Sequence, residues 1–304
     1  KTRKLVETYV ELLESGADPL RIAAVTFTEK AAAEMRDRIR AALYAKQGQW
    51  TKTIAVLPAA LISTIHGFCG ILLRERGLDL GIDPAFTILD EQRSLDFARE
   101  AARETIRHEI RTGNEDVEGL FGDFGLERLV ETIVSAGYWL NSIGKDASWL
   151  EARVEDQRRA AAALVEEVGG QIHKYGGDYE KIGELADELE TRKAKHPLRK
   201  RDDPRALLPK IGQIAGVSAA ERLSRLAGLS LDRFRSKKRS MNAMDFDDLL
   251  LGVRDLLRNH TAIRRNYQNH FQALLVDEFQ DTDEVQAEII SLLADDPDRP
   301  GRLA

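Results

Sequence analysis

The sequence predicts an α/β fold in which a parallel sheet is interrupted by a long all-helical segment. Three short apolar runs lack helical periodicity, end in polar residues and are each followed by a helical pattern; they predict strands at 22–27, 61–65 and 273–277. Strands that alternate with helices favour parallel pairing, with the helices packed on the faces of the sheet. The three strands are expected to be neighbours in one sheet, because their polar tips then meet at one edge.

Helices are expected around these strands. The first is indicated by apolar residues at three- and four-residue spacing, namely Leu5, Val6, Tyr9, Val10 and Leu13. Gly16 and the pair Asp18-Pro19 end it, and an alanine-rich helix follows at 31–42. The helices after the second and third strands carry apolar faces made of Phe68, Ile71 and Leu72, and of Val285, Ile289 and Leu292.

The middle of the chain differs from both ends. From about 90 to 240 the apolar runs disappear, and charged segments such as 149–168 and 178–195 show only helical periodicity. A further helix, which Asp245 is placed to cap, has the apolar residues Phe246, Leu249, Leu250, Val253 and Leu257. One α/β domain is therefore expected from 1–89 and 241–304, with 90–240 as a helical insertion.

Composition limits the kinds of protein that this chain can be. Hydrophobic residues make up 43% of its 304 residues, enough for one large or two moderate globular domains. The net charge of −6 means that any nucleic-acid-binding surface must be local. The single cysteine, Cys69, excludes a disulfide framework and a cysteine-based zinc site built from this chain alone. With no apolar stretch of membrane-spanning length and no signal peptide, a soluble, cytoplasmic protein is expected.

The most specific motif is the string LLVDEFQDT at 274–282. Its strand delivers Asp277 and Glu278 to the carboxyl end, where ligands bind in α/β sheets. In an ATPase the first such carboxylate helps to hold magnesium and the second polarises the attacking water. A plain strand end followed by a helix cap at Asp281 and Glu284 is the alternative. The whole string resembles the Walker B box of UvrD/RecB DNA helicases, which favours the ATPase interpretation.

The resemblance implies further roles around ATP. The chain begins with Lys1-Thr2 and runs into a helix and the strand at 22–27, as expected after a Gly-rich phosphate loop that ends in Gly-Lys-Thr. By this resemblance Lys1 meets the β- and γ-phosphates, Thr2 and Asp277 hold Mg²⁺, and Gln280 senses the γ-phosphate. ATP and Mg²⁺ are the implied cofactors. Without the later motifs, the alternative interpretation of Lys1-Thr2 is a solvent-exposed dipeptide at the start of a helix.

The segment at 26–35 resembles the second helicase box of this superfamily. There the resemblance implies that Thr26, Phe27 and Thr28 face single-stranded DNA, since hydroxyls and free amides at a helix start bind phosphate and an exposed aromatic ring stacks on a base. The alternative is a capped alanine-rich helix with Phe27 in the core. Glu29 stands where relatives commonly have Asn, and its negative charge excludes it from the expected DNA site.

The segment at 63–69 resembles the third helicase box of this superfamily. Its His-Gly-Phe-Cys sequence resembles that of RecB/AddA nuclease-helicases more than that of plain repair helicases. Thr64 and His66 are the DNA-contacting residues that it implies. The alternative interpretation of His66 is a histidine that lies beside apolar residues and caps the core. Cys69 is interpreted as buried packing rather than as a nucleophile, because no histidine and carboxylate accompany it.

Charged clusters elsewhere have two interpretations each. The segment at 244–250 resembles another family signature, and its carboxylates Asp245, Asp247 and Asp248 are interpreted as a helix N-terminal turn rather than as a metal site. Basic runs at 192–201 and 233–239 either contact the phosphates of duplex DNA or are solvated faces.

The four boxes, in family order, imply a parallel-sheet P-loop NTPase (RecA-like) domain with a large all-helical insertion subdomain. The implied function is ATP-driven translocation on single-stranded DNA with unwinding of duplex DNA. The wording of the boxes suggests a RecB/AddA-like helicase-nuclease for double-strand break repair, and the candidate partner is a second nuclease-helicase subunit. The alternatives are a stand-alone UvrD/Rep-type repair helicase and a non-catalytic DNA-binding fragment.

Two parts of the family's ATP site have no counterpart in this sequence. The glycines of the phosphate loop would precede Lys1, and the second motor domain, which supplies arginines to the same ATP, would follow Ala304. The isolated chain is therefore expected not to hydrolyse ATP at a measurable rate, whereas a full-length parent protein would.

Overall fold

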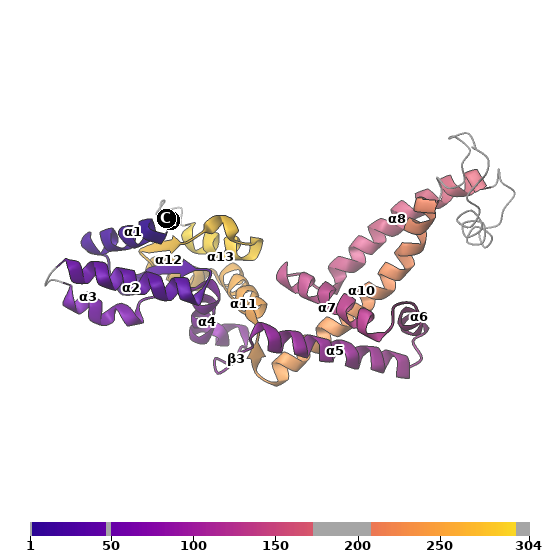
Figure 1. Ribbon diagram of the computed structural model, residues 1–304, viewed down its shortest axis with the longest axis horizontal. Helices are drawn as coiled ribbons and strands as arrows, with labels where there is room; N and C mark the ends of the chain where they lie inside the picture. Colours follow the sequence, from indigo (N-terminus) through magenta and orange to yellow (C-terminus); the bar gives the residue numbers. More distant parts are fainter. Residues whose placement is uncertain (1, 47–49, 173–207, 296–304) are drawn as a thin grey trace. The chain divides into compact units, whose positions relative to one another are not determined.

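The computed structural model describes residues 2–46, 50–172 and 208–295. These residues divide into two compact units (Figure 1). The sheet unit comprises the described parts of Lys1–Leu95, Ser142–Gly144 and Lys238–Ala304, and the helical unit comprises those of Asp96–Asn141 and Lys145–Lys237.

The sheet unit is built on three parallel strands, β1 (Ile22–Thr26), β2 (Ile62–Thr64) and β5 (Ala273–Val276), in the order β2-β1-β5. Ala24 of β1 is in register with Ile62 on one side and with Leu275 on the other. The prediction that the three strands are neighbours in one parallel sheet is confirmed. Their polar tips lie at one edge.

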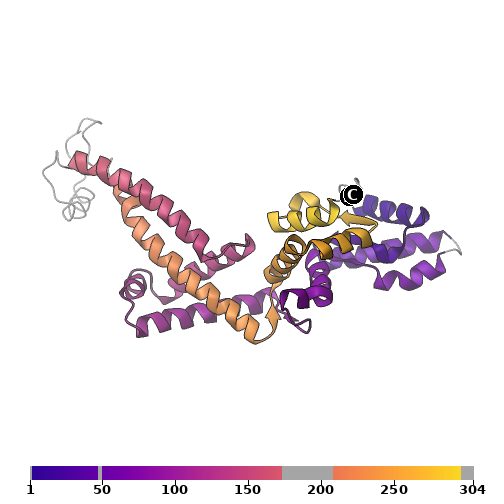
Figure 2. The same ribbon diagram turned by 180° about the vertical axis from the view of Figure 1, so that it is seen from behind.

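Helices cover both faces of this sheet (Figures 1 and 2). Because side chains alternate along a strand, Ile22 and Ala24 pack on one face, and Ala23 and Val25 pack on the other. The first face is covered by α1 (Thr2–Glu14), α2 (Glu29–Ala45) and residues flanking and within α3 (Thr51–Val56). The second is covered chiefly by α4 (Ile65–Arg76), α11 (Phe246–Asn259) and α13 (Glu284–Ala294), with α12 (Thr261–His270) beside α11 and α13.

Most of the predicted helix faces are buried as expected. The five apolar residues of α1 pack against the sheet, and Gly16 ends the helix with a φ of 94°, a left-handed conformation that favours glycine. Phe68 and Leu72 of α4 are buried, but Ile71 is exposed, so that part of the predicted face is wrong. Cys69 is fully buried, as predicted.

A second, two-stranded sheet was not predicted. In it β3 (Thr87–Ile88) pairs in parallel with β4 (Ala243–Met244), so that the chain segments on either side of the long helical region lie together. Each strand has only two residues, too few for a periodic pattern in the sequence.

The described residues of the helical unit form helices and no strand. They are α5 (Glu91–Arg111), α6 (Glu115–Phe124), α7 (Leu126–Ser142), α8 (Ala147–Ile172) and α10 (Leu208–Ser240); α5, α7 and α10 extend into the sheet unit. The predicted helical pattern at 149–168 is confirmed by α8, whereas the segment at 178–195 and the basic run at 192–201 lie outside the described residues.

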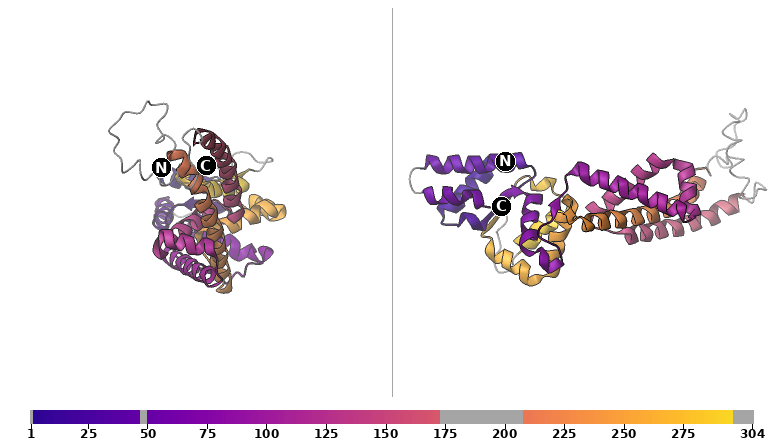
Figure 3. Two further views of the ribbon diagram at one scale, coloured as in Figure 1. Left: turned by 90° about the vertical axis from the view of Figure 1, so that its right-hand side faces the viewer. Right: turned by 90° about the horizontal axis from the view of Figure 1, so that it is seen from below.

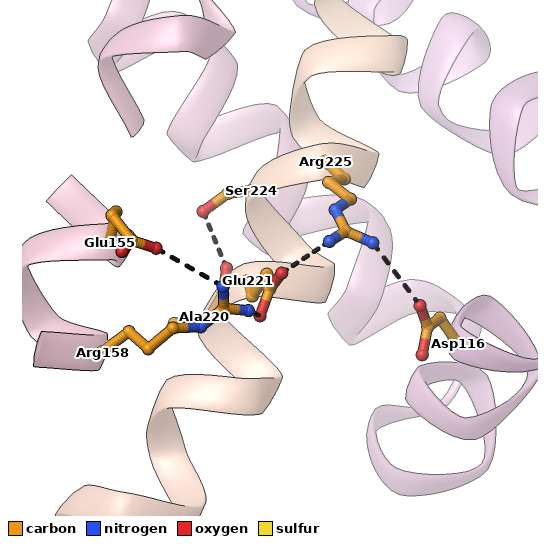
Figure 4. Close-up of polar contacts among 7 residues, drawn as sticks. All are labelled: Asp116, Glu155, Arg158, Ala220, Glu221, Ser224 and Arg225. Carbon is orange, nitrogen blue, oxygen red and sulfur yellow. Dashed lines mark hydrogen bonds and ion pairs between the residues drawn. The ribbon is translucent and has the colours of Figure 1, made fainter. Parts of the chain in front are cut away.

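Ion pairs join three helices of this unit. In Figure 3, α8 (pink) runs beside α10 (orange), and Figure 4 shows the contacts between them. Arg158 of α8 pairs with Glu221 of α10 at 2.6 Å, and Arg225, which also pairs with Glu221, lies 3.9 Å from Asp116 of α6. Since the arginines are more than half exposed, such pairs contribute about 1 kcal/mol or less each.

Candidate functional site

The tip of β5 presents two adjacent carboxylates. Asp277 directly follows the strand and is buried, and its backbone N–H donates to the Val25 carbonyl oxygen at 2.9 Å. Glu278 has φ 52° and ψ 41°, a left-handed conformation that costs a non-glycine residue about 1–2 kcal/mol. The Gln280 side-chain amide donates to the Glu278 carboxylate. Sequence reasoning placed all three residues at this strand end but gave no sign of the strained backbone at Glu278.

The helix that follows is capped by a residue other than the one expected. Asp281 lies in a single turn of 3-10 helix, whereas the Asp283 carboxylate accepts from the Gln286 backbone N–H at 2.8 Å and begins α13. The alternative of a cap at Asp281 and Glu284 is therefore wrong. The carboxylates at 277 and 278 are not needed to cap this helix.

At the tip of β1, one of the predicted DNA-binding residues is buried and the other two are exposed. Thr26 is buried, and its hydroxyl donates to the Thr28 carbonyl oxygen at 3.1 Å. The Thr28 hydroxyl accepts from the Ala31 N–H at 3.1 Å and so caps α2, while the residue itself stays exposed. The Phe27 side chain is 36% exposed, so the alternative that placed it in the core is wrong.

At the tip of β2, Thr64 caps α4. Its hydroxyl accepts from the Gly67 N–H at 3.0 Å and donates to the Glu29 carboxylate at 2.8 Å. Thr64 is only 6% exposed. The same edge therefore brings together the two predicted DNA-binding segments, with Glu29 as a link between them that the sequence did not indicate.

His66 is the second residue of α4 and lies beside an aromatic residue of another helix. Its ring centroid is 4.8 Å from that of Phe246, the first residue of α11. Burial lowers the pKa of His66, and the charge of Asp283 opposes this shift. The imidazole is therefore neutral at pH 7. Its ring contact with Phe246 joins the β2 tip to the start of α11, and the charge of Asp283 acts on it from the start of α13.

Phe246 is a candidate site residue that sequence reasoning missed. It was assigned to the apolar face of its helix, but it is 41% exposed and faces His66. The available signal was its position directly after the cap Asp245, where a side chain lies at the exposed helix end rather than along the buried face. Leu249, Leu250, Val253 and Leu257 of the same predicted face are buried, as expected.

The acidic cluster at the start of α11 is a cap, as predicted. Asp245 accepts from the Asp248 N–H at 3.0 Å, and Asp248 accepts from the Asp245 N–H at 3.0 Å. The described part of the chain contains no group of three or more His, Cys, Asp or Glu side chains arranged to hold a metal ion. Lys238 pairs with both carboxylates and is 2% exposed, so for this residue both interpretations of the basic run at 233–239 are wrong.

The residues at the β5 tip fit a magnesium ion by their chemistry. Mg²⁺ takes oxygen ligands, keeps several waters and needs only one or two protein carboxylates when a substrate supplies phosphate oxygens. Asp277, next to Glu278 at a strand end, offers such a carboxylate. Lys1 and the Thr2 side chain, which were expected beside it, lie outside the described residues; Thr2 itself begins α1.

No helix among residues 2–46, 50–172 and 208–295 combines the length and the apolarity that a membrane span requires.

Comparison with known proteins agrees with this arrangement. The family model of the UvrD/REP helicase N-terminal domain matches residues 1–299. Proteins named as the A subunit of an ATP-dependent helicase/nuclease are similar over almost all of this chain: 24% identity in Syntrophomonas wolfei, over 96% of the chain, and 25% in Pediococcus pentosaceus, over 100%. The matched regions are 30% and 32% of those proteins, so the chain spans about a third of their length. The chain belongs to the UvrD/REP helicase N-terminal domain family.

Proposed function

We propose that this chain is the first, ATP-binding motor domain of an ATP-dependent DNA helicase. Residues 1–89 and 241–304 would form a P-loop NTPase (RecA-like) domain, with 90–240 as its helical insertion. The observation that carries the proposal is the parallel register of β2, β1 and β5, because it brings the paired carboxylates and the exposed aromatic residues to one sheet edge. Family membership supports it.

In this proposal the tip of β5 holds the ATP chemistry. Bound Mg²⁺ would neutralise phosphate charge, as it does in phosphoryl transfer generally. Asp277 would hold the ion, together with Thr2, and Lys1 would meet the β- and γ-phosphates. Glu278 would position the attacking water, and its side-chain contact with Gln280 supports a role for that glutamine beside the γ-phosphate.

The tips of β1 and β2 would hold single-stranded DNA. Phe27, Thr28, His66 and Phe246 offer two exposed aromatic rings, a neutral imidazole and an exposed helix N-terminus, which suit base stacking and phosphate contact. Thr26 and Thr64 are buried, and their hydroxyls bond within the protein. Their proposed contribution is therefore to shape the two tips.

For the whole protein we propose a helicase-nuclease that unwinds duplex DNA at double-strand breaks in the cytoplasm, and its proposed partner is a second nuclease-helicase subunit. Support comes from the relatives, which are named as A subunits of ATP-dependent helicase/nucleases.

The test is ATP hydrolysis by the full-length protein in the presence of single-stranded DNA. Glu278→Gln should leave ATP binding intact and lower the rate of hydrolysis about 100-fold or more, because the amide cannot act as the water-positioning base. Glu284→Gln, which removes an exposed carboxylate from the adjacent helix, is the control and should hydrolyse ATP normally. Normal hydrolysis by Glu278→Gln would show that the ATP site lies elsewhere.

Asp277→Asn tests Mg²⁺ binding by Asp277 separately from the positioning of the attacking water by Glu278. It should weaken ATP binding that depends on Mg²⁺, measured as nucleotide affinity at a series of Mg²⁺ concentrations, because an amide is a poorer ligand for a hard cation. Equal Mg²⁺ dependence in the variant and the wild type would contradict the assignment.

A further inference from the structure

Glu29 links the two segments that carry the proposed DNA site. It is the first residue of α2, directly after the cap Thr28, and its carboxylate accepts the Thr64 hydroxyl hydrogen at 2.8 Å. Thr64 lies 35 residues further along the chain, at the end of β2. This contact, called here the Glu29–Thr64 bridge, joins the tip of β1 to the tip of β2.

The bridge occupies the Thr64 hydroxyl. A hydroxyl has one hydrogen to donate, and that hydrogen goes to Glu29. A lone pair of the same oxygen accepts from the Gly67 N–H at 3.0 Å. While the bridge is formed, Thr64 therefore has no donor for a phosphate oxygen, although the side chain is held rigidly at the sheet edge.

The fold leaves space for this bridge at Gly67. A Cβ atom at that position would lie 3.2 Å from Thr64 Oγ1 and 3.8 Å from Glu29 Oε1. The first distance is tighter than most Cβ contacts, so a larger residue at this position would press on the Thr64 hydroxyl, whereas the second is an ordinary contact that leaves Glu29 in place.

We propose that Glu29 is a positioning residue that has two opposite effects on single-stranded DNA binding. Through the bridge it fixes the β2 tip and the start of α4. Through its charge, which stays exposed at the same edge, it repels the phosphate backbone and keeps affinity low. This inference rests on the proposed DNA function, and it identifies Glu29 as the residue that adjusts how tightly this edge holds DNA.

Two substitutions in the 304-residue chain separate these effects. Glu29→Gln keeps an oxygen acceptor for Thr64 and removes the charge, whereas Glu29→Ala removes both. Glu34→Gln is the control, because it removes another exposed charge from the next turn of α2, where Glu34 pairs with Arg38. The readouts are the affinity for oligo(dT) across a salt series and the hydrogen-exchange rate of the Gly67 amide.

Glu29→Gln should bind oligo(dT) about two- to five-fold more tightly than wild type at 50 mM salt, and the gain should vanish near 1 M salt, where charges are screened within about 3 Å. Its Gly67 amide should exchange at the wild-type rate. In Glu29→Ala the Gly67 amide should exchange at least several-fold faster, because Thr64 loses one of its two anchors. Glu34→Gln should match the wild type in both readouts.

Each readout tests one of the two proposed effects of Glu29 independently of the other. Identical Gly67 exchange in Glu29→Ala and the wild type would overturn the positioning role. If Glu29→Gln gives no salt-dependent gain over Glu34→Gln, the charge effect is overturned. If the wild type and Glu29→Gln both fail to bind oligo(dT) while Gly67 exchange responds as expected, the proposed DNA function is overturned and the bridge is supported.

Discussion

The ammonium group of Lys238 lies 2.7 Å from Oδ2 of Asp245, and both side chains are buried. The same ammonium lies 2.6 Å from Oδ2 of Asp248, and the Ser94 hydroxyl donates to Asp245 at 3.0 Å. The ion group therefore joins the end of α10 to the cap of α11, the helix whose first residue faces His66. A buried charge is tolerated only when it is paired and hydrogen-bonded, as Lys238 and Asp245 are here.

Lys238→Met should strongly destabilise the sheet unit. The substitution leaves the buried Asp245 carboxylate and the partly buried Asp248 carboxylate without their cation, and breaking a buried ion group typically costs about 3–5 kcal/mol. Unfolding in urea should be followed by the fluorescence of Trp50, the only tryptophan of the sheet unit, after Trp139 and Trp149 are replaced by Phe. Lys46→Met, also in the sheet unit, is the control: Lys46 pairs with Glu14, both side chains are exposed, and the loss of this pair should cost about 1 kcal/mol or less.

The same ion group predicts a pH dependence. Burial and the neighbouring charge of Asp245 raise the pKa of Asp248 to about 6, while Lys238 keeps the pKa of Asp245 low. A carboxyl whose pKa is raised on folding stabilises the protein below its unfolded pKa, and that stability is lost as pH rises through about 6. The wild type should therefore lose stability relative to Asp248→Asn, by on the order of 2 kcal/mol, as pH rises from 4 to 7.

Unfolding curves of both proteins at pH 4, 5, 6 and 7 measure this difference. In the Asp248→Asn variant the introduced amide retains an oxygen that can accept the Asp245 N–H, so the cap survives. A constant difference between the two proteins across this range would show that Asp248 titrates near its ordinary value.

The core of the fold was predictable because it depends on local patterns. The apolar runs of β1, β2 and β5 have no helical period. Every residue of β1 and β5 is buried, as in parallel strands between helix layers, and β2 is buried except at Ser63, which is partly exposed. The pairing of β3 with β4 was not predictable, since two-residue strands leave no pattern. The burial of Lys238 was missed because a run of basic residues normally marks a solvated face, and its partners lie on a different helix.

The candidate site was predictable only as a set of residues. The sequence motifs indicated which strand ends bear the functional residues. They do not reveal contacts between segments that are distant in the sequence. The Glu29–Thr64 bridge and the His66–Phe246 contact each join residues that are far apart in the chain. Glu29 was excluded from the expected site on the basis of its charge, and the structure instead gives it a hydrogen bond to one of the predicted site residues.

Phe246 and Phe27 should both strengthen binding of single-stranded DNA by stacking. Replacing either by Ala should lower affinity for oligo(dT) by about 1–3 kcal/mol, roughly five- to 150-fold. The slope of affinity against salt should stay at the wild-type value, since that slope reports ionic contacts with phosphate. Tyr44→Ala is the matched control, because Tyr44 is an exposed aromatic residue at the opposite end of α2. An unchanged affinity in Phe246→Ala would remove that residue from the site.

The strained backbone at Glu278 should be detectable as a gain in stability when glycine replaces it. Only glycine adopts φ near +52° without steric cost, so a glutamate there is retained at the expense of stability, a pattern typical of functional sites. Glu278→Gly and Glu278→Ala remove the carboxylate equally, and both should abolish ATP hydrolysis in the full-length protein. They differ in the backbone strain, which remains only in Glu278→Ala, and in the unfolded-state entropy, which is greater for glycine and opposes the gain.

Glu278→Gly should therefore be more stable than Glu278→Ala by about 1 kcal/mol, measured by urea unfolding with Trp50 as the reporter. Asn242, the other non-glycine residue with positive φ among the described residues, provides the control. Asparagine tolerates the left-handed region better than most residues, so Asn242→Gly should change stability less than Glu278→Gly does. Equal stability of Glu278→Gly and Glu278→Ala would mean that the backbone at the β5 tip relaxes without strain.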